Sequence, residues 1–128
     1  LFEELIKNAE EIFKKLKLPY RVVSMCTADI GVVAAKKYDL EVYMPREKEY
    51  KEVVSCSNCT AYQSTRLNIK YQKDKEKHYA HTINSTAIAT SRTLRAILEN
   101  YQQKDGTVKV PDVLIPYMNG VKVLGNKK

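Results

Sequence analysis

The first eighteen residues have the spacing of an amphipathic helix. Apolar side chains recur every three or four positions, while Glu and Lys fill the positions between them. The apolar positions are Leu1, Phe2, Leu5, Ile6, Ala9, Ile12, Phe13 and Leu16. Pro19 follows, and because a proline forces the preceding residue out of the helical region, we expect the helix to end before it. The polar face is charge-balanced rather than cationic, which favours packing on the protein over lying on a membrane.

The middle of the chain carries the signals of β-strands. Residues 38–44 alternate, with apolar or aromatic side chains at even positions and Asp39 and Glu41 between them. Four other segments are rich in β-branched and aromatic residues. The predicted strands are Tyr20–Thr27, Tyr38–Met44, Tyr50–Ser57, Leu67–Gln72 and Tyr79–Thr86. The lysine-rich stretch from Lys73 to Lys77 reads as a solvated hairpin loop.

A second helical period returns between Ile88 and Gln102. Its apolar side is formed by Leu94, Ile97, Leu98 and Tyr101. Asp105-Gly106 then marks a turn that opens an irregular tail. A helix, about five strands with short connections and a further helix predict an α+β fold, with helices packed on one face of an antiparallel sheet. We find no internal repeat and no linker, so we expect a single domain over residues 1–128.

Charge narrows the classes of partner. The chain has 128 residues and a formal net charge of +7, with a sequence pI near 9.3. Residues 66–95 hold seven basic side chains against two acidic ones, Asp74 and Glu76. Such an excess favours anionic partners such as nucleotides or RNA, although an ordinary solvated surface explains many charge runs. No apolar run approaches the roughly 20 residues of a membrane span, so no membrane partner is expected.

Three cysteines do not make a disulfide framework, and reduced thiols in a cytosolic protein are expected. Cys56 and Cys59, followed by His78 and His81, form a pattern that can bind structural zinc. On regular strands, however, positions three apart point to opposite faces, so we expect no zinc. A phosphate-binding glycine loop, a dinucleotide fingerprint and a nucleophile elbow are also missing from the sequence.

Several segments together resemble the C-terminal part of the seryl-tRNA synthetases, a family of class II aminoacyl-tRNA synthetases. They are Cys26–Gly31, Lys37–Glu41, Tyr50–Asn58, His81–Gln102 and Val110–Met118. The similarity runs over essentially the whole chain, in order, and the segment ending in Arg92 is similar to class II motif 3. The resemblance implies part of the class II catalytic fold and serine–tRNA ligase activity in the parent protein.

The resemblance also implies roles for individual residues. Those matching ATP-binding positions are Glu52, Val53, Val54, Ser55 and Arg92. Glu52 and Ser55 would also hold the magnesium on the ATP phosphates, because magnesium prefers hard oxygen ligands. Since they lie three apart, they would need a β-bulge or a bend between them to face the same way. The alternatives are that Glu52 is an exposed strand carboxylate and that Arg92 belongs to the polar face of a helix.

Thr86 matches the position that contacts the substrate L-serine, and Asn84 lies beside it in the same predicted strand. A hydroxyl that hydrogen-bonds the serine side chain would reject alanine, because the polar group of the site would be left unpaired. The other implied partners are ATP and, in the intact enzyme, tRNA(Ser) and a second copy in a cytoplasmic homodimer. Without the resemblance, a strand threonine with no special role is the default for Thr86.

Two departures from the family pattern limit this reading. Ala87 and Ala89 stand where motif 3 of the wider class usually has glycines. Motif 1, motif 2 and the N-terminal tRNA-binding arm have no counterpart in residues 1–128, so we expect a C-terminal fragment that is inactive alone. The alternatives are a non-catalytic synthetase-like module that binds nucleotide or RNA through residues 66–95, and a small zinc-dependent interaction domain.

Overall fold

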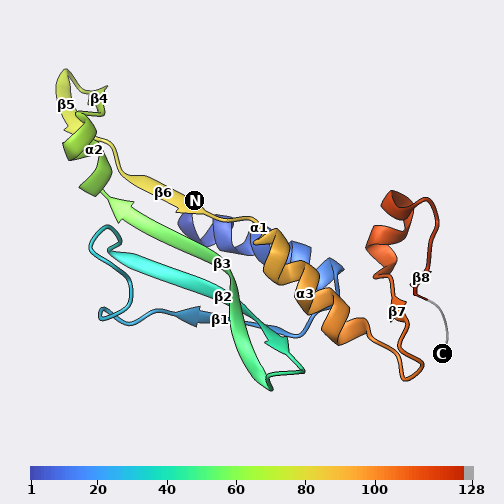
Figure 1. The fold of residues 1–128 in the computed structure, drawn as a ribbon. Helices are drawn as coiled ribbons and strands as arrows, with labels where there is room; N and C mark the ends of the chain where they lie inside the picture. The colour runs from blue at the N-terminus through green and yellow to red at the C-terminus, as the bar shows by residue number, and fades with distance from the viewer. Residues whose placement is uncertain (126–128) are drawn as a thin grey trace.

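Four antiparallel strands form the central sheet of the protein (Figure 1). The computed structural model describes residues 1–125. In sheet order, the strands are β1 (Tyr20–Ser24), β2 (Lys36–Met44), β3 (Glu49–Thr60) and β6 (Thr82–Ser85). Each strand pairs antiparallel with its neighbour, which confirms the predicted antiparallel sheet. β3 is longer than the predicted strand and pairs with both β2 and β6.

Two helices, α1 (Phe2–Lys15) and α3 (Thr90–Tyr101), pack against one face of this sheet. One apolar cluster joins them to the strands. Its buried members are Ile6, Ala9, Phe13, Leu16, Leu18, Leu40, Val42, Met44, Val53, Val54, Cys56 and Ala96. Phe13 is completely buried, and burying such a side chain stabilises the fold by about 1.5–3 kcal/mol. The prediction of helices on one face of an antiparallel sheet is confirmed.

Both helices are shorter than their periodicity predicted. Lys17 takes a left-handed φ of 53°, and the Leu18 N–H donates to the Phe13 carbonyl oxygen across 3.2 Å. This Schellman pattern ends α1 before Pro19 acts. The Tyr101 hydroxyl donates to the Leu16 carbonyl oxygen across 2.6 Å, which ties the ends of the two helices together. α3 begins at Thr90 because the residues before it hydrogen-bond along β3 instead.

The segment between β3 and β6 differs most from the prediction. It contains α2 (Tyr62–Leu67), which the sequence did not suggest, and a hairpin of β4 (Lys70–Lys73) and β5 (Glu76–Tyr79). The predicted strands Leu67–Gln72 and Tyr79–Thr86 are therefore wrong in their bounds, and the predicted loop shrinks to the turn Asp74–Lys75.

Local hydrogen bonds explain this rearrangement. The buried Ser64 hydroxyl contacts the carbonyl oxygens of both Ala61 and Ala80, and Asn68 ends α2 in a left-handed conformation. The chain therefore bends at Ala80 and His81, where a continuous strand was expected.

The tail lies beyond α3 (Figure 1). It contains β7 (Val108–Lys109), a 3-10 helix (Asp112–Met118) and β8 (Val123–Leu124), and β7 pairs antiparallel with β8. Lys17 Nζ lies 2.9 Å from Asp112 Oδ2, which links the tail to the end of α1. Among residues 1–125, no helix has the length and apolar character needed to cross a membrane.

Candidate functional site

The face of the sheet that lacks the apolar cluster carries polar side chains. Residues directly opposite one another on neighbouring strands share a face, so the register shows which of them meet there. Asp39 of β2 lies opposite Ser55 of β3. Lys37 lies opposite Ser57, which in turn lies opposite Asn84 of β6. Neighbouring rows of polar side chains therefore cross this face.

A β-bulge at Val53 sets the orientation of two candidate ATP residues. Glu52 lies opposite Glu41 and Val54 lies opposite Leu40, so Val53 is left without a partner on β2. An extra residue of this kind shifts the alternation of side chains by one position. Because Glu41 and Asp39 share a face, their partners Glu52 and Ser55 do so too. The bulge or bend that the sequence required between Glu52 and Ser55 is confirmed.

The same bulge turns Val53 and Val54 into the core. Each is only 1% exposed, and both belong to the apolar cluster. Their side chains cannot contact a ligand on the polar face, so any role in ATP binding falls to their backbone. The Val53 carbonyl oxygen already accepts a hydrogen bond from the Ala89 N–H across 2.9 Å.

Asn84 and Thr86 lie along the edge of β3 that pairs with β6, beside the candidate ATP residue Ser55. The Thr86 N–H donates to the Ser55 carbonyl oxygen across 3.1 Å, which extends the strand pairing beyond β6. The Asn84 side-chain amide donates weakly to Cys59 Sγ across 3.6 Å. Thr86 is exposed, and its side chain has no hydrogen-bond partner among the described residues. The structure thus brings both predicted serine-binding residues next to Ser55 and Ser57.

Arg92, in the first turn of α3, contacts β3 at Glu52. Its Nη1 atom donates to the Glu52 carbonyl oxygen across 2.9 Å and lies 3.7 Å from Glu52 Oε1. The two side chains are 57% and 43% exposed, so a ligand can still reach them. They line a cavity of about 340 Å³ together with Met44, Lys51 and Arg95. Arg92 is therefore more than a solvated charge on the polar face of a helix.

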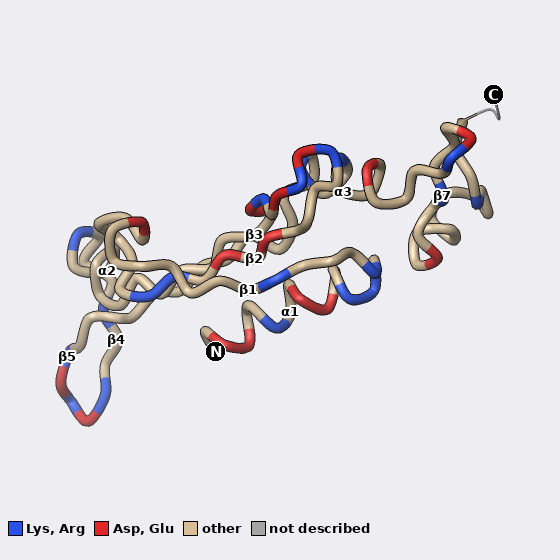
Figure 2. Tube along the Cα trace, turned by 90° about the horizontal axis from the view of Figure 1, so that it is seen from below, with Lys and Arg blue, Asp and Glu red and all other residues tan. Residues whose placement is uncertain are grey.

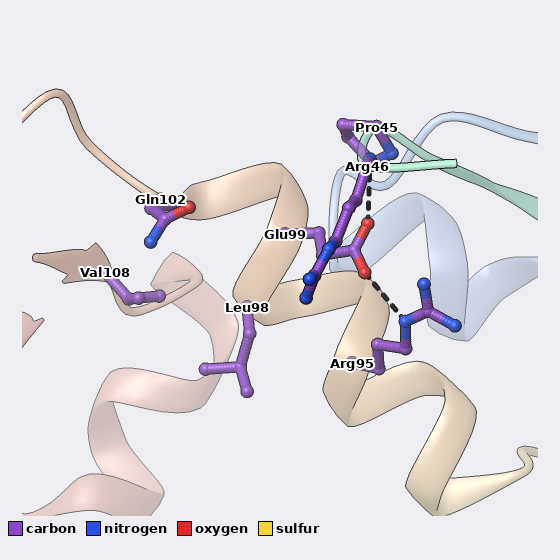
Figure 3. Close-up of a pocket in the computed structure, with 7 residues that line it drawn as sticks. All are labelled: Pro45, Arg46, Arg95, Leu98, Glu99, Gln102 and Val108. Atoms are coloured by element: carbon purple, nitrogen blue, oxygen red, sulfur yellow. Dashed lines mark hydrogen bonds and ion pairs between the residues drawn. The ribbon is translucent and has the colours of Figure 1, made fainter. Parts of the chain in front are cut away.

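A charged network supports α3 from the neighbouring turn between β2 and β3. Arg95 donates to Glu99 Oε1 and to Glu47 Oε1, each across 2.7 Å. Glu99 Oε2 accepts the backbone N–H of Arg46 across 3.0 Å (Figure 3). The hydrogen bond from the Arg46 N–H lowers the pKa of Glu99 most, and the hydrogen bond from Arg95 lowers it further. Arg95 also lowers the pKa of Glu47. The network fastens the α3 segment that carries Arg92 to the turn that leads into β3.

A larger cavity lies on this network rather than on the predicted site. It measures about 800 Å³ and is lined by Pro45, Arg46, Arg95, Leu98, Glu99, Gln102 and Val108 (Figure 3). Its walls are mainly apolar, and Arg95 and Glu99 are already paired with each other. Two predicted site residues, Glu52 and Arg92, line the smaller cavity, so that cavity is the better guide to function.

The alternation of residues 38–44 placed Asp39 on the face away from the core, but sequence reasoning did not name Asp39 or Lys37 as site residues. Asp39 Oδ2 lies 3.3 Å from Lys37 Nζ, and their side chains are only 4% and 19% exposed. The other carboxylate oxygen, Oδ1, is buried without a partner among the described residues.

Glu52 and Ser55 both present side-chain oxygens, the type of ligand that magnesium prefers. Both residues lie on one face of β3, and Glu52 remains accessible. Magnesium usually takes one or two protein oxygens and completes its shell with water and phosphate. Within residues 1–125, no group of three or more His, Cys, Asp and Glu side chains could hold a metal by itself. Cys56 lies in the core cluster, whereas His78 lies on the exposed β5.

Comparison with known proteins places this geometry in a family. Residues 1–101 match the family described as tRNA synthetase class II core domain (G, H, P, S and T). The chain is 67% identical over 127 residues to the serine–tRNA ligase of Methanocella arvoryzae, covering 97% of this chain and 30% of that protein. It is 59% identical over 117 residues to the enzyme of Pyrococcus abyssi, covering 90% of this chain and 26% of the relative.

Solved structures of seryl-tRNA synthetases have the same fold as this chain. Seryl-tRNA synthetase from Pyrococcus horikoshii complexed with ATP superposes with a TM-score of 0.93 at 53% identity, covering 99% of this chain and 29% of that one. Cytoplasmic serine–tRNA ligase from Naegleria fowleri in complex with AMP gives a TM-score of 0.91 at 48% identity, covering 99% and 31%. The chain spans about 30% of the length of such relatives. With a family match over residues 1–101 and this structural agreement, the chain belongs to the class II tRNA synthetase core-domain family.

Proposed function

We propose that this chain is the part of a serine–tRNA ligase that holds ATP and receives serine. In the full reaction, the serine carboxylate attacks the α-phosphate of ATP, which gives seryl-adenylate and releases pyrophosphate. The seryl group then passes to the terminal ribose of tRNA(Ser). The observation that carries the proposal is the convergence of Arg92, Glu52, Ser55 and Thr86 around the bulge at Val53, in a chain 67% identical to a serine–tRNA ligase.

Arg92 and Glu52 are the proposed ATP contacts. The guanidinium keeps N–H donors beyond the one used on the Glu52 carbonyl oxygen, and a planar guanidinium can fork onto phosphate or stack on a base. Glu52 and Ser55 would hold a magnesium ion, which neutralises phosphate charge when bound. Chemistry of this kind depends on positioning and charge neutralisation, and it requires no catalytic histidine or nucleophile.

Thr86 and Asn84 are the proposed serine contacts. Both lie one strand away from Ser55 and Ser57, and Thr86 exposes a hydroxyl beside the candidate phosphate site. A hydroxyl that bonds the serine side chain selects serine over alanine, because alanine would leave the threonine unpaired. For the intact enzyme we further propose tRNA(Ser) as a partner, assembly as a homodimer and a cytoplasmic location.

The test is serine-dependent exchange of pyrophosphate into ATP. A protein spanning the full length of the relatives should exchange with serine and not with glycine or alanine. The 128-residue chain alone should not, because motif 1 and motif 2 have no counterpart in it. Exchange driven by another amino acid would contradict the proposed substrate, and clear exchange by the 128-residue chain would contradict its assignment as an inactive part.

A further inference from the structure

The hairpin of β4 and β5 projects away from the central sheet (Figures 1 and 2). Every residue from 65 to 79 is exposed. Asp74 and Lys75 form its turn with left-handed φ values of 50° and 69°, the conformation of a two-residue hairpin turn. A two-stranded hairpin without a core beneath it adds little stability of its own. Its exposed side chains are therefore available for contacts with a partner.

The positive charges of this arm are not neutralised within the described part of the chain. Residues 66–79 carry five cations and two acids, a net charge of +3. The cations are Arg66, Lys70, Lys73, Lys75 and Lys77. None of them takes part in an ion pair among residues 1–125, whereas Arg21, Lys36 and Lys51 each contact a glutamate.

The two faces of the hairpin differ in charge. Lys70 lies opposite Tyr79, and Gln72 lies opposite Lys77, so these four residues share a face that holds no acid. Lys70 Nζ lies 4.8 Å from the centre of the Tyr79 ring. A hollow of about 390 Å³ adjoins this face and is lined by Asn68, Lys70, Tyr71, Gln72 and Lys77. The other face carries Glu76 beside Lys73.

We propose that the face formed by Lys70, Gln72, Lys77 and Tyr79 binds the phosphate backbone of an RNA strand. Two ammonium groups that have no acidic partner among residues 1–125, beside an exposed aromatic ring, match phosphates and a base face. An acidic protein segment would satisfy the lysines but would leave the ring unused. Lysines on exposed strands also discourage pairing between sheet edges. A role limited to that protection predicts no RNA contact at this face.

The arm leads directly to the proposed serine site. Its base is fixed where the Ala80 N–H donates to the Ile69 carbonyl oxygen across 3.2 Å. Asn84 lies only five residues beyond Tyr79, roughly 16 Å of extended chain. Because the chain bends at Ala80 and His81, this length is an upper limit on the separation of Tyr79 and Asn84. That the RNA is an aminoacylation substrate rests on the proposed function, whereas the contact itself does not.

The experiment measures binding of a fluorescent RNA to the 128-residue chain by anisotropy. The RNA is a stem with a single-stranded 3′ end, titrated at several salt concentrations between about 50 and 200 mM. Combined Lys70→Gln and Lys77→Gln substitutions should weaken binding about tenfold or more. They should also flatten the slope of log affinity against log salt by about 1.5, because each of the two lost phosphate contacts removes roughly 0.7–0.9.

The matched control removes the same charge elsewhere. Lys7 and Lys104 are exposed and lie outside the hairpin, so the combined Lys7→Gln and Lys104→Gln variant should bind within about twofold of wild type. Circular dichroism checks that both variants fold. Equal weakening by both double variants would overturn the proposal, as would failure of the wild-type chain to bind RNA at low salt.

Two further measurements distinguish RNA binding from binding of an acidic protein, and the RNA contact from the proposed enzymatic function. Poly-glutamate should compete poorly for the chain, and competition as strong as that of RNA would assign the surface to an acidic protein instead. In the full-length protein, the Lys70→Gln and Lys77→Gln double variant should keep wild-type pyrophosphate exchange while losing RNA affinity. Absence of exchange in the wild type would count against the proposed function only, since RNA binding is measured separately.

Discussion

The Nη1 atom of Arg92 donates a hydrogen bond to the backbone carbonyl oxygen of Glu52 across 2.9 Å. This bond joins the first turn of α3 to β3 beside the bulge at Val53. A guanidinium can make it and still direct other N–H groups toward a ligand, whereas a lysine ammonium lacks the planar fork. The relationship therefore explains why arginine suits this position better than a simple cation.

Replacing Arg92 by lysine should impair ATP use in the full-length protein. Loss of a charge-assisted hydrogen bond costs about 1.5–3 kcal/mol, which is roughly one to two decades in kcat/KM for ATP. The constants for serine should change little. The measurement is adenylation kinetics with each substrate varied in turn. Arg66→Lys on α2 is the control, and unchanged ATP kinetics in Arg92→Lys would return Arg92 to a purely structural role.

The Glu99 carboxylate should stabilise the fold in a pH-dependent way. Its pKa is lowered by the Arg46 N–H and then by Arg95, so its contribution is complete above the unfolded-state value near 4.3. The contribution is lost as the pH falls through the lower folded pKa. Glu99→Gln should therefore lower the urea midpoint at about pH 7, and its difference from wild type should narrow toward about pH 3.

Glu4→Gln provides the control for this titration. Glu4 is exposed on α1 and has no ion pair among the described residues, so its substitution should lower the midpoint at about pH 7 much less than Glu99→Gln does. A Glu99→Gln difference that stays constant from neutral to acidic pH would show that the carboxylate charge does not support the turn between β2 and β3.

The three cysteines should react with a thiol reagent in two classes. Cys26 is exposed, whereas Cys56 and Cys59 are 0% and 1% exposed. Burial raises the pKa of the Cys56 thiol, which disfavours the reactive thiolate. Ellman's reagent should label one thiol quickly in the native chain and the other two only on unfolding. Cys26→Ser should remove the fast phase, and rapid labelling of two or three thiols would contradict the buried positions.

The purified protein should carry no stoichiometric zinc. Cys56 packs in the apolar cluster and His78 lies on the exposed hairpin, so the sequence pattern of two cysteines and two histidines is not assembled at one place in residues 1–125. Elemental analysis after dialysis against a chelator measures this. One zinc per chain would revive the interpretation as a zinc-dependent interaction domain.

Much of the fold followed from side-chain periodicity. The alternation of residues 38–44 correctly placed Leu40, Val42 and Met44 in the core, because one face of β2 is covered by helices and the other is not. The segment around α2 could not be read in the same way. Its bend depends on Ser64, whose hydroxyl contacts the Ala80 carbonyl oxygen sixteen positions away. Such a contact leaves no local pattern in the sequence.

The candidate site was only partly predictable. Resemblance supplied Glu52, Ser55, Thr86 and Arg92, and the strand geometry required a bulge that the structure then located at Val53. The contact between Arg92 and the Glu52 carbonyl oxygen joins residues forty positions apart, and only tertiary structure reveals it. Asp39 was not proposed as a site residue because an acid on the polar face of an alternating strand usually faces solvent, whereas Asp39 is only 3% exposed.

Thr86 offers the sharpest test of serine recognition. Thr86→Val keeps the shape of the side chain and the backbone bond to the Ser55 carbonyl oxygen, but it removes the hydroxyl. A lost hydrogen bond to a buried partner costs about 1–3 kcal/mol, so kcat/KM for serine should fall by roughly one to two decades in the full-length protein. The ATP constants should change little, because Thr86 is not among the residues that line the cavity beside Arg92.

Selectivity distinguishes this role from a structural one. If the Thr86 hydroxyl bonds the serine side chain, Thr86→Val should narrow the preference for serine over alanine, because alanine no longer leaves a polar group unpaired. A general loss of stability would instead lower the rates with both amino acids together. Thr90→Val at the exposed start of α3 is the matched control and should leave the serine constants unchanged. Unchanged serine kinetics in Thr86→Val would show that this threonine is an ordinary residue at the end of a strand.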